Sequence, residues 1–165
     1  MFREMRRFRQ KLSEQESREI LSRGKYGVLA VLGDDGYPYT VPLNYVYRQD
    51  KIYIHSAKAG HKVDALAACD KVSLCVVDKD TVVEEEYTSY FRSVIAFGRM
   101  RRVTDEKEMY EAIDALARKY YPTDTAEHRK EAIDREWAPL AMYEMTIEHL
   151  SGKEAKELMQ ARQRN

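Results

Sequence analysis

The sequence has 165 residues, and its 28 Lys and Arg residues are balanced by 28 Asp and Glu residues, so the net charge is zero. This length suits a single domain over 1–165, and 44% hydrophobic residues are enough for a globular core. A neutral chain lacks the general attraction to phosphate backbones that nucleic-acid-binding domains show, and no apolar run is long enough to cross a bilayer. We therefore expect a protein that binds neither nucleic acid nor a membrane.

The cysteines and the N-terminus indicate a cytoplasmic protein. Cys69 and Cys75 are too few for a disulfide framework and do not form a C-x-x-C pair, so both are expected to be reduced core residues. The N-terminal arm, 1–12, is rich in arginine but lacks the apolar stretch of a secretory signal. We interpret this arm as a solvated or partner-contacting tail.

The first elements carry clear local signals. Ser13 and Glu16 form a capping box that begins a helix, and Gly24 is expected to end it as a left-handed C′ glycine. An apolar strand over 26–32 follows. The next four residues, GDDG at 33–36, predict a hairpin with a primed turn, because Asp-Gly tolerates positive φ.

The second strand, over 37–47, contains two prolines, Pro38 and Pro42. Proline cannot donate to a ladder, so this strand is expected at a sheet edge or in a distorted stretch. The backbone groups that such a strand leaves free would suit the edge of a planar heterocycle. A plain edge strand is the alternative interpretation.

The main chemical signal of the sequence lies in the loop after the next strand, KIYIHS. Ser56 offers a hydroxyl, and Gly60 allows a close approach of the backbone. Lys58 and Lys62 bring positive charge to the start of a short helix over 61–69, where free N–H groups already favour an anion. A phosphate is the simplest ligand for this loop, and an ordinary surface turn is the alternative.

The second half of the chain is expected to contain strands first and helices later. Gly98, in the middle of the longest strand, indicates a bulge. Thr104 and Ser151 are the expected N-caps of two helices. The expected elements are strands over 72–77, 91–103 and 140–147, an irregular acidic stretch over 78–89, and helices over 105–120, 126–136 and 153–163.

About six strands with closely spaced hairpins predict antiparallel pairing rather than a doubly wound parallel sheet. A small closed barrel with peripheral helices is the economical arrangement, because closure removes exposed edges. The four histidines form no metal-binding motif, and the sequence contains neither a nucleophile elbow nor a glycine-rich nucleotide loop. We expect no metal site, which leaves the anion loop as the chemical signal.

Four segments resemble the flavin-binding split-barrel proteins related to pyridoxamine-phosphate oxidase, and within that superfamily the nitroimidazole-resistance (Nim-type) branch. They follow one another in a matching order and spacing: VPLNYVY at 41–47, IYIHSAKAGHK at 52–62, YFRSVIAFGRMRRV at 90–103 and IEHLSGKEA at 147–155. The resemblance implies a mainly β fold with peripheral α-helices, built as an antiparallel six-stranded split β-barrel. It also implies a homodimer with FMN bound at the interface.

The same resemblance implies roles for particular residues. His55 would face the flavin ring and the substrate pocket and is the candidate catalytic residue. The residues around the FMN phosphate would be Ser56, Ala57, Lys58, His61 and Lys62. The backbone against the ring edge would be that of Pro42, Leu43 and Asn44. The strand that forms part of the groove would contribute Phe91, Arg92 and Ser93.

These roles imply an FMN-dependent oxidoreductase that passes electrons from reduced flavin to a small organic acceptor, such as a nitroaromatic compound. His55 could donate a proton, because the unperturbed pKa of histidine is about 6.5; a packing role in the strand is the alternative. The C-terminal arginine and histidine motif of true pyridoxamine-phosphate oxidases has no close counterpart here. The alternative function is a non-catalytic flavin- or haem-binding protein, with His149 or the tail as the haem ligand.

Overall fold

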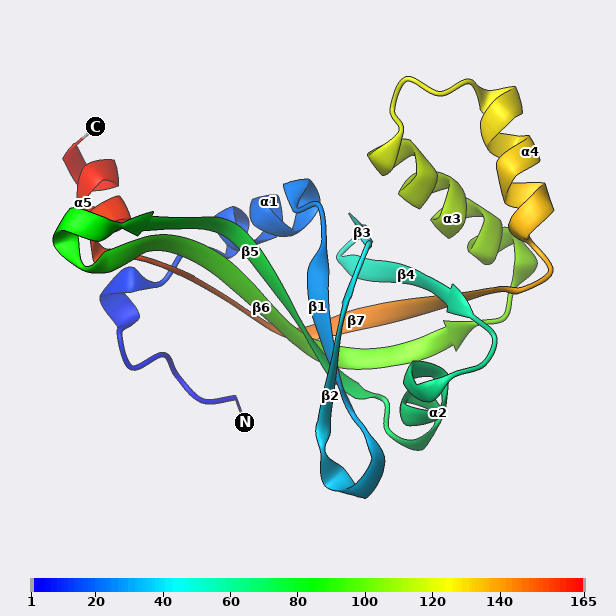
Figure 1. Cartoon of the computed structure of the whole chain (residues 1–165), viewed down its shortest axis with the longest axis horizontal. Helices are drawn as coiled ribbons and strands as arrows, with labels where there is room; N and C mark the ends of the chain where they lie inside the picture. The colour runs from blue at the N-terminus through cyan, green and yellow to red at the C-terminus, as the bar shows by residue number, and fades with distance from the viewer. Residues whose placement is uncertain (1, 165) are drawn as a thin grey trace.

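The computed structural model describes residues 2–164, which form one antiparallel sheet of seven strands surrounded by five α-helices (Figure 1). The strands are β1 (Gly27–Leu32), β2 (Pro38–Leu43), β3 (Val46–Arg48), β4 (Lys51–Ala57), β5 (Lys71–Val83), β6 (Thr88–Val103) and β7 (Leu140–Glu154). The α-helices are α1 (Glu14–Arg23), α2 (His61–Ala68), α3 (Glu106–Tyr120), α4 (Ala126–Glu136) and α5 (Lys156–Arg164). None of the helices described is both long and apolar enough to cross a bilayer.

The strand predicted over 37–47 is divided into two strands, β2 and β3, and this division explains why there are seven strands instead of six. The order across the sheet is β2-β1-β5-β6-β7-β4-β3, so β2 and β3 lie at opposite edges. Asn44 and Tyr45 alone separate them in the sequence. Among the pairings of residues 2–164, no ladder joins β2 to β3, and the sheet is an open, split barrel rather than a closed one.

The prolines of β2 lie where the sequence predicts, on an edge strand. Pro38 is opposite Leu32 and Pro42 is opposite Val28, both on β1. Because β2 has a hydrogen-bonded neighbour on one side only, the missing N–H groups do not interrupt a central ladder. The other side of β2 faces away from the sheet.

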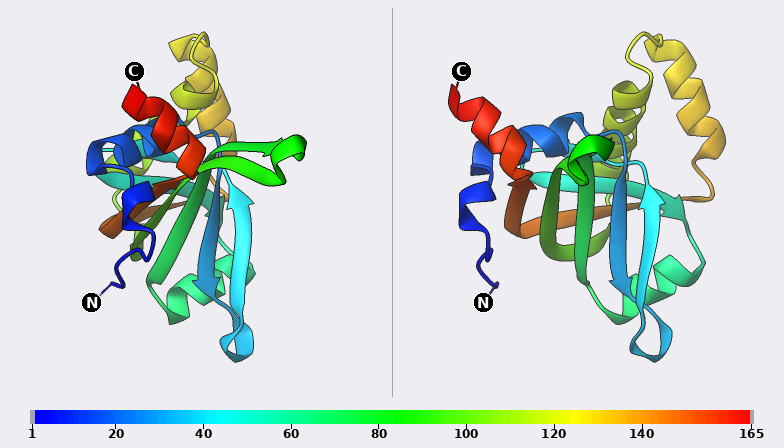
Figure 2. Two further views of the ribbon diagram at one scale, coloured as in Figure 1. Left: turned by 90° about the vertical axis from the view of Figure 1, so that its left-hand side faces the viewer. Right: turned by 60° about the vertical axis from the view of Figure 1, so that its left-hand side comes forward.

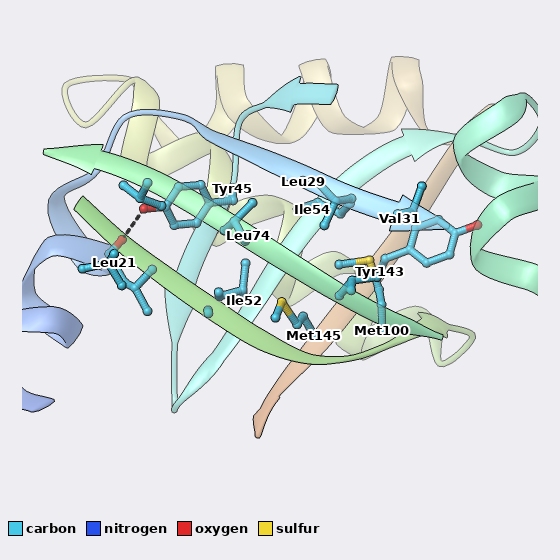
Figure 3. Packing of buried hydrophobic residues seen from close by; sticks show 14 of the residues in the cluster. Leu21, Leu29, Val31, Tyr45, Ile52, Ile54, Leu74, Met100, Tyr143 and Met145 are labelled. Atoms are coloured by element: carbon cyan, nitrogen blue, oxygen red, sulfur yellow. Dashed lines mark hydrogen bonds between the residues drawn. The ribbon is translucent and has the colours of Figure 1, made fainter. Parts of the chain in front are cut away.

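The main core lies inside the curved sheet, and Tyr45 is one of its largest buried side chains (Figure 3). Its hydroxyl donates a 2.7 Å hydrogen bond to the carbonyl of Leu21, near the end of α1. This bond satisfies a helix carbonyl that would otherwise lack an intrahelical partner. Tyr45, which lies between β2 and β3 in the sequence, therefore also binds the end of α1.

Helix α1 begins as expected and ends differently. Ser13 and Glu16 form both hydrogen bonds of the capping box. Gly24 follows the helix, but its φ of −59° shows that the predicted left-handed C′ conformation is wrong. The glycine is needed for space instead, because a Cβ there would lie 2.5 Å from the hydroxyl of Tyr45 and 2.6 Å from the side chain of Val76.

Two predicted backbone features are confirmed. In the β1–β2 hairpin, Asp35 and Gly36 have φ values of 54° and 78°, as a primed turn requires. The ladder between β6 and β7 shifts register between Phe97 and Gly98. A Cβ at Gly98 would lie 2.0 Å from the carbonyl oxygen of Thr146, so the bulge brings two backbones too close for any side chain.

The segment predicted as irregular, 78–89, is mostly strand. β5 continues through 78–83, where β-branched residues pair with the start of β6, and the acidic run Glu84–Glu86 forms only the turn. The two strands extend beyond the rest of the sheet as a projecting hairpin (Figure 2). The prediction was wrong because the charged run 78–80 is followed by three β-branched residues, 81–83, and both runs belong to the paired strand.

The two predicted caps in the second half are also wrong. The N-cap of α3 is Asp105 rather than Thr104, since the Asp105 carboxylate accepts a 2.8 Å hydrogen bond from the N–H of Glu108. Ser151 lies within β7, which continues past its predicted end because it pairs with the first half of β6. The last helix, α5, accordingly begins at Lys156. Both cysteines are free, as expected, but each is only partly buried and neither belongs to the core clusters.

Candidate functional site

The loop between β4 and α2 has the geometry of an anion site. Gly60 has a φ of 124°, which side-chain-bearing residues rarely adopt, and a Cβ there would meet open space. The N–H groups of Val63 and Asp64 donate to the Gly60 carbonyl at 2.8 and 3.1 Å. The N–H groups of His61 and Lys62 therefore precede the helical ladder and lie at the positive end of the helix dipole.

Lys62 adds a positive charge that is partly removed from water. Its side chain is half-buried, and this burial lowers the pKa of the ammonium. Within residues 2–164, no carboxylate forms an ion pair with either Lys58 or Lys62. A half-buried ammonium without a counter-ion is stabilised by an anionic ligand. Together with the hydroxyl of Ser56, this set of donors fits a phosphate group.

His55 lies at the end of β4, directly before Ser56. Burial lowers the pKa of its imidazole, and the positive charge of Lys62 lowers it further. Both effects favour the neutral form of the ring, which donates one hydrogen bond and accepts one. Lys62 thus acts on two groups at once, because it attracts an anion and disfavours a proton on His55.

His61 contributes its backbone to the loop, whereas its side chain packs elsewhere. The imidazole stacks on the ring of Tyr39 with centroids 4.2 Å apart and planes 20° apart. Its Nε2 lies 3.6 Å from the carboxylate of Asp34 in the β1–β2 hairpin. These contacts join the start of α2 to the hairpin, which the sequence did not indicate.

The predicted ring-edge segment, Pro42 to Asn44, ends where β2 ends. Because β3 pairs antiparallel with β4, with Val46 opposite Tyr53, the residues before β3 run toward the His55 end of β4. The side-chain amide of Asn44 donates a 3.1 Å hydrogen bond to the carbonyl of Lys25. The structure therefore brings this segment and the β4–α2 loop to the same region of the sheet.

The polar groups of Tyr45, at the break between β2 and β3, are satisfied by the end of α3. The N–H of Tyr45 donates to the hydroxyl oxygen of Tyr120 at 3.1 Å, and its carbonyl accepts a 2.9 Å hydrogen bond from Lys119. Burial lowers the pKa of Lys119 to about 8. No signal in the sequence around Tyr45 indicates these partners, because they lie on a helix far along the chain.

The groove strand residues Phe91, Arg92 and Ser93 lie on β6, away from the His55 end of the sheet. Arg92 forms ion pairs with Glu154 at 3.2 Å and with Asp78 at 3.5 Å. On β6 it is eleven residues from Val103, whose partner on β7 is also the partner of His55. That spacing corresponds to about 35 Å along a strand. Along β6 these residues are thus far from the His55 end, whereas across the sheet Pro42 is level with Ile95 through Val28 and Cys75.

A cavity that the sequence did not indicate lies between the end of β4 and the α3–α4 hairpin. Its volume is about 560 Å³, and His55, Ser56 and Ala57 form part of its wall. Its apolar wall includes Ile113, Leu116, Ala132, Ile133, Pro139 and Leu140. Figure 1 shows α3 and α4 side by side above this end of the sheet. The proposed catalytic histidine thus borders both the anion loop and an apolar space.

A second, more polar cavity of about 890 Å³ lies between the N-terminal segment, α1 and the end of β7. His149, the residue considered as a haem ligand, lines it and stacks on Phe2 with ring centroids 4.7 Å apart. This cavity shares no lining residue with the anion loop. Haem ligation by His149 stays a prediction.

The comparisons with known proteins agree with this geometry. The family model described as pyridoxamine 5'-phosphate oxidase matches residues 13–154. No curated protein matches the sequence. Among solved structures, a candidate 5-nitroimidazole antibiotic resistance protein from Bacteroides thetaiotaomicron is 21% identical, with a TM-score of 0.71 over 87% of this chain and 85% of that chain.

Two further structures extend the likeness. A conserved hypothetical protein from Mycobacterium tuberculosis is 19% identical, with a TM-score of 0.81 over 94% of this chain and 92% of that chain. An FAD-binding protein from Mesorhizobium loti is 27% identical, with a TM-score of 0.65 over 88% of this chain and 97% of that chain. These likenesses show a shared split-barrel fold.

Proposed function

This chain belongs to the pyridoxamine 5'-phosphate oxidase family, and on that premise we propose that it is an FMN-dependent oxidoreductase. It passes electrons from reduced flavin to a small organic acceptor, such as a nitroaromatic compound. The observation that carries the proposal is the half-buried Lys62, which has no carboxylate partner in the described chain and lies in the first turn of α2, six residues after Ser56. This donor set suits the dianionic phosphate of FMN.

FMN supplies the electron transfer that amino-acid side chains do not provide. Ser56, Lys58 and Lys62 hold its phosphate, with the N–H groups of the α2 N-terminus. The Pro42–Asn44 segment lies at the same region of the sheet and borders the ring. A solved relative described as FAD-binding supports a flavin in this fold. We propose the mononucleotide because the four matched segments resemble FMN-binding split-barrel proteins.

His55 handles a proton for the acceptor. Reduction of a nitro group to a nitroso group consumes two electrons and two protons and releases water, with the electrons drawn from reduced FMN. The imidazole of His55 can deliver one proton to an acceptor oxygen, and solvent supplies the other. Since burial and Lys62 lower its pKa below 6.5, its protonated fraction grows only as the pH falls.

We propose that a second copy of the chain completes the flavin site. Arg92 lies eleven residues along β6 from Val103, which shares its β7 partner with His55, and this long path supports a contribution of Phe91, Arg92 and Ser93 to the partner's flavin. The β5–β6 hairpin that precedes them exposes Val82 to 68% and Tyr87 to 98%, which is typical of a contact surface rather than of a solvated ribbon. We infer a homodimer in which this hairpin reaches the partner's groove.

An absorption spectrum of the purified protein tests the cofactor. We expect flavin bands either as purified or after addition of FMN, and tighter retention of FMN than of FAD. A colourless protein that retains no flavin absorbance after incubation with FMN and removal of the excess would show that the proposal is wrong.

A second candidate function is flavin binding without turnover. The observation that favours it is the lowered pKa of His55, because a mostly neutral imidazole is a weak acid at neutral pH. Rapid reoxidation of the reduced protein by a nitro compound, lost in His55→Ala, supports the enzyme. Tight flavin binding without any acceptor in a broad screen supports the binding protein.

A further inference from the structure

The cavity between β4 and the α3–α4 hairpin has the properties of a small-molecule site. We propose that it binds the electron acceptor and selects uncharged, planar aromatic molecules over carboxylates. Its identity as the acceptor site rests on the function proposed above, whereas the binding itself does not. The cavity volume of about 560 Å³ falls within the range of small-molecule pockets, about 300–1,000 Å³.

The walls of the cavity favour a flat apolar ligand. Leu116, Ile133 and Leu140 are buried and lie on three different elements, α3, α4 and β7. Tyr120 and Tyr121, at the end of α3, add aromatic rings to the same wall. Aromatic and aliphatic walls bind a ring by burying its apolar surface and stacking against its face.

The cavity adjoins the anion loop. His55, Ser56 and Ala57 line the cavity and directly precede Lys58, and Lys62 follows in the first turn of α2. A molecule in the cavity therefore lies beside the imidazole of His55. This continuity is what makes the cavity an acceptor site rather than an unrelated apolar space.

The acidic and basic side chains of the lining near α4 disfavour an anionic ligand at that end of the cavity. The arginine of the lining, Arg129, is only 8% exposed and donates to the carboxylate of Asp114 at 2.6 Å and to the main-chain carbonyls of Asp124 and of Thr125, the N-cap of α4. His128 is bound to Asp124 through a 2.7 Å contact of its Nδ1. Glu136 adds a further negative charge to the lining. A carboxylate ligand would meet acidic side chains and find Arg129 already paired.

The test uses a matched pair of probes, nitrobenzene and 4-nitrobenzoate, which share a ring and a nitro group but differ in charge. Binding of each to the full-length protein is measured by calorimetry at neutral pH. We expect nitrobenzene to bind and 4-nitrobenzoate to bind at least about tenfold more weakly, a difference of about 1.4 kcal/mol. Equal affinities would overturn the charge selection.

Variants locate the binding. Ala132→Trp fills the cavity from α4, and Ala117→Phe fills it from α3. Ala126→Trp, at the exposed first turn of α4, is the matched control. We expect both filling variants to lose nitrobenzene binding by at least about tenfold, while the control retains it. Retention of nitrobenzene binding in a folded filling variant, verified by its unfolding midpoint, would overturn the location.

FMN binding is measured separately for every variant, so that the two proposals fail in different ways. If the wild type binds no FMN but Ala132→Trp still abolishes nitrobenzene binding, the proposed function is wrong and the aromatic site stands. If FMN binds to all variants and nitrobenzene binds to none, including the wild type, the aromatic site is wrong.

Discussion

The main-chain N–H of Tyr45 donates a 3.1 Å hydrogen bond to the hydroxyl oxygen of Tyr120, which ties the break between β2 and β3 to the end of α3. The neighbouring Lys119 donates to the carbonyl of Tyr45, and its ammonium lies 3.9 Å from the centre of the Tyr45 ring. A helix thus provides the hydrogen bonds that a sheet neighbour would provide elsewhere. The hydrogen bonds therefore hold the end of α3 against the connection from β2 to β3.

Tyr120→Phe should destabilise the protein by about 1 kcal/mol, because the N–H of Tyr45 loses its acceptor. The loss is moderate since Tyr120 is 37% exposed and water can partly replace its hydroxyl. The midpoint of urea unfolding measures it. Tyr121→Phe is the control, because its hydroxyl makes no hydrogen bond within residues 2–164. Equal midpoints for the two variants would contradict the role of Tyr120.

Lys62→Ala should weaken FMN binding about tenfold to a hundredfold, since one charge-assisted contact to a phosphate is worth about 1.5–3 kcal/mol. Equilibrium titration with flavin absorbance or fluorescence gives the affinity. Lys71→Ala, an exposed lysine on β5, should leave the affinity unchanged. Unchanged binding in Lys62→Ala would place the phosphate elsewhere.

Lys62→Gln should raise the pKa of His55, because the substitution removes a positive charge that opposes protonation. Burial remains, so the pKa should stay below 6.5. Titration of the imidazole by NMR measures the shift. Binding of inorganic phosphate to the wild type should act in the same direction, as it neutralises Lys62. A pKa of His55 that responds to neither change would show that the two groups do not interact.

Glu144 should make stability depend on pH at the acidic end. Burial opposes its ionisation, but hydrogen bonds from Lys51, Arg101 and Tyr53 outweigh that effect and lower its pKa to about 2 from 4.5. A lowered carboxyl pKa stabilises the folded state above pH 4.5, and this contribution is lost as the pH falls toward 2. Urea unfolding at a series of pH values should show this loss.

Glu144→Gln tests that assignment directly. We expect a loss of about 3 kcal/mol at neutral pH, since the cationic partners keep their charges and lose a carboxylate that is only 2% exposed. The slope of stability with pH below 4.5 should decrease in the same variant. Glu148→Gln, which removes a 40% exposed partner of Arg99, should change stability by less than about 1 kcal/mol. A similar effect of both variants would be inconsistent with the buried network.

Mixed dimers test whether two chains build one flavin site. Lys62→Ala and Phe91→Ala should each bind FMN poorly as homodimers, because each damages both sites. After subunit exchange, a mixed dimer has one site with both changes and one intact site, so part of the FMN binding should return. Exchange without any recovery, confirmed by labelled subunits, would place Phe91 outside the flavin site or within the same chain's site.

Local signals in the sequence predicted much of the fold. The capping box at Ser13 and the primed turn at Asp35–Gly36 each depend on a few adjacent residues. The division of the strand at Tyr45 does not depend on adjacent residues, because the hydrogen-bond partner of Tyr45 is 75 residues away. Sequence patterns with a period of two or 3.6 residues carry no information about such a contact.

The candidate site shows the same limit. Ser56 at the end of β4, Lys58 in the following loop and Lys62 in the first turn of α2 are only six residues apart, so an anion site there could be predicted from spacing in the sequence. The cavity beside His55 depends on how the α3–α4 hairpin packs on β4, which is a tertiary contact between distant segments. The role of Phe91 came only from the resemblance to a family, and it stays a prediction that the mixed dimers test.

The crossing from β2 to β3 limits how far the two edges of the sheet can separate. Asn44 and Tyr45 join opposite edges, so the barrel can open there by no more than about 10 Å, the span of a few extended residues. A longer insertion in the β5–β6 turn would leave the barrel as it is. An insertion between Asn44 and Tyr45 would instead let β2 and β3 move apart. Both edge strands would then be open to pairing with strands of other molecules, and the protein would tend to aggregate.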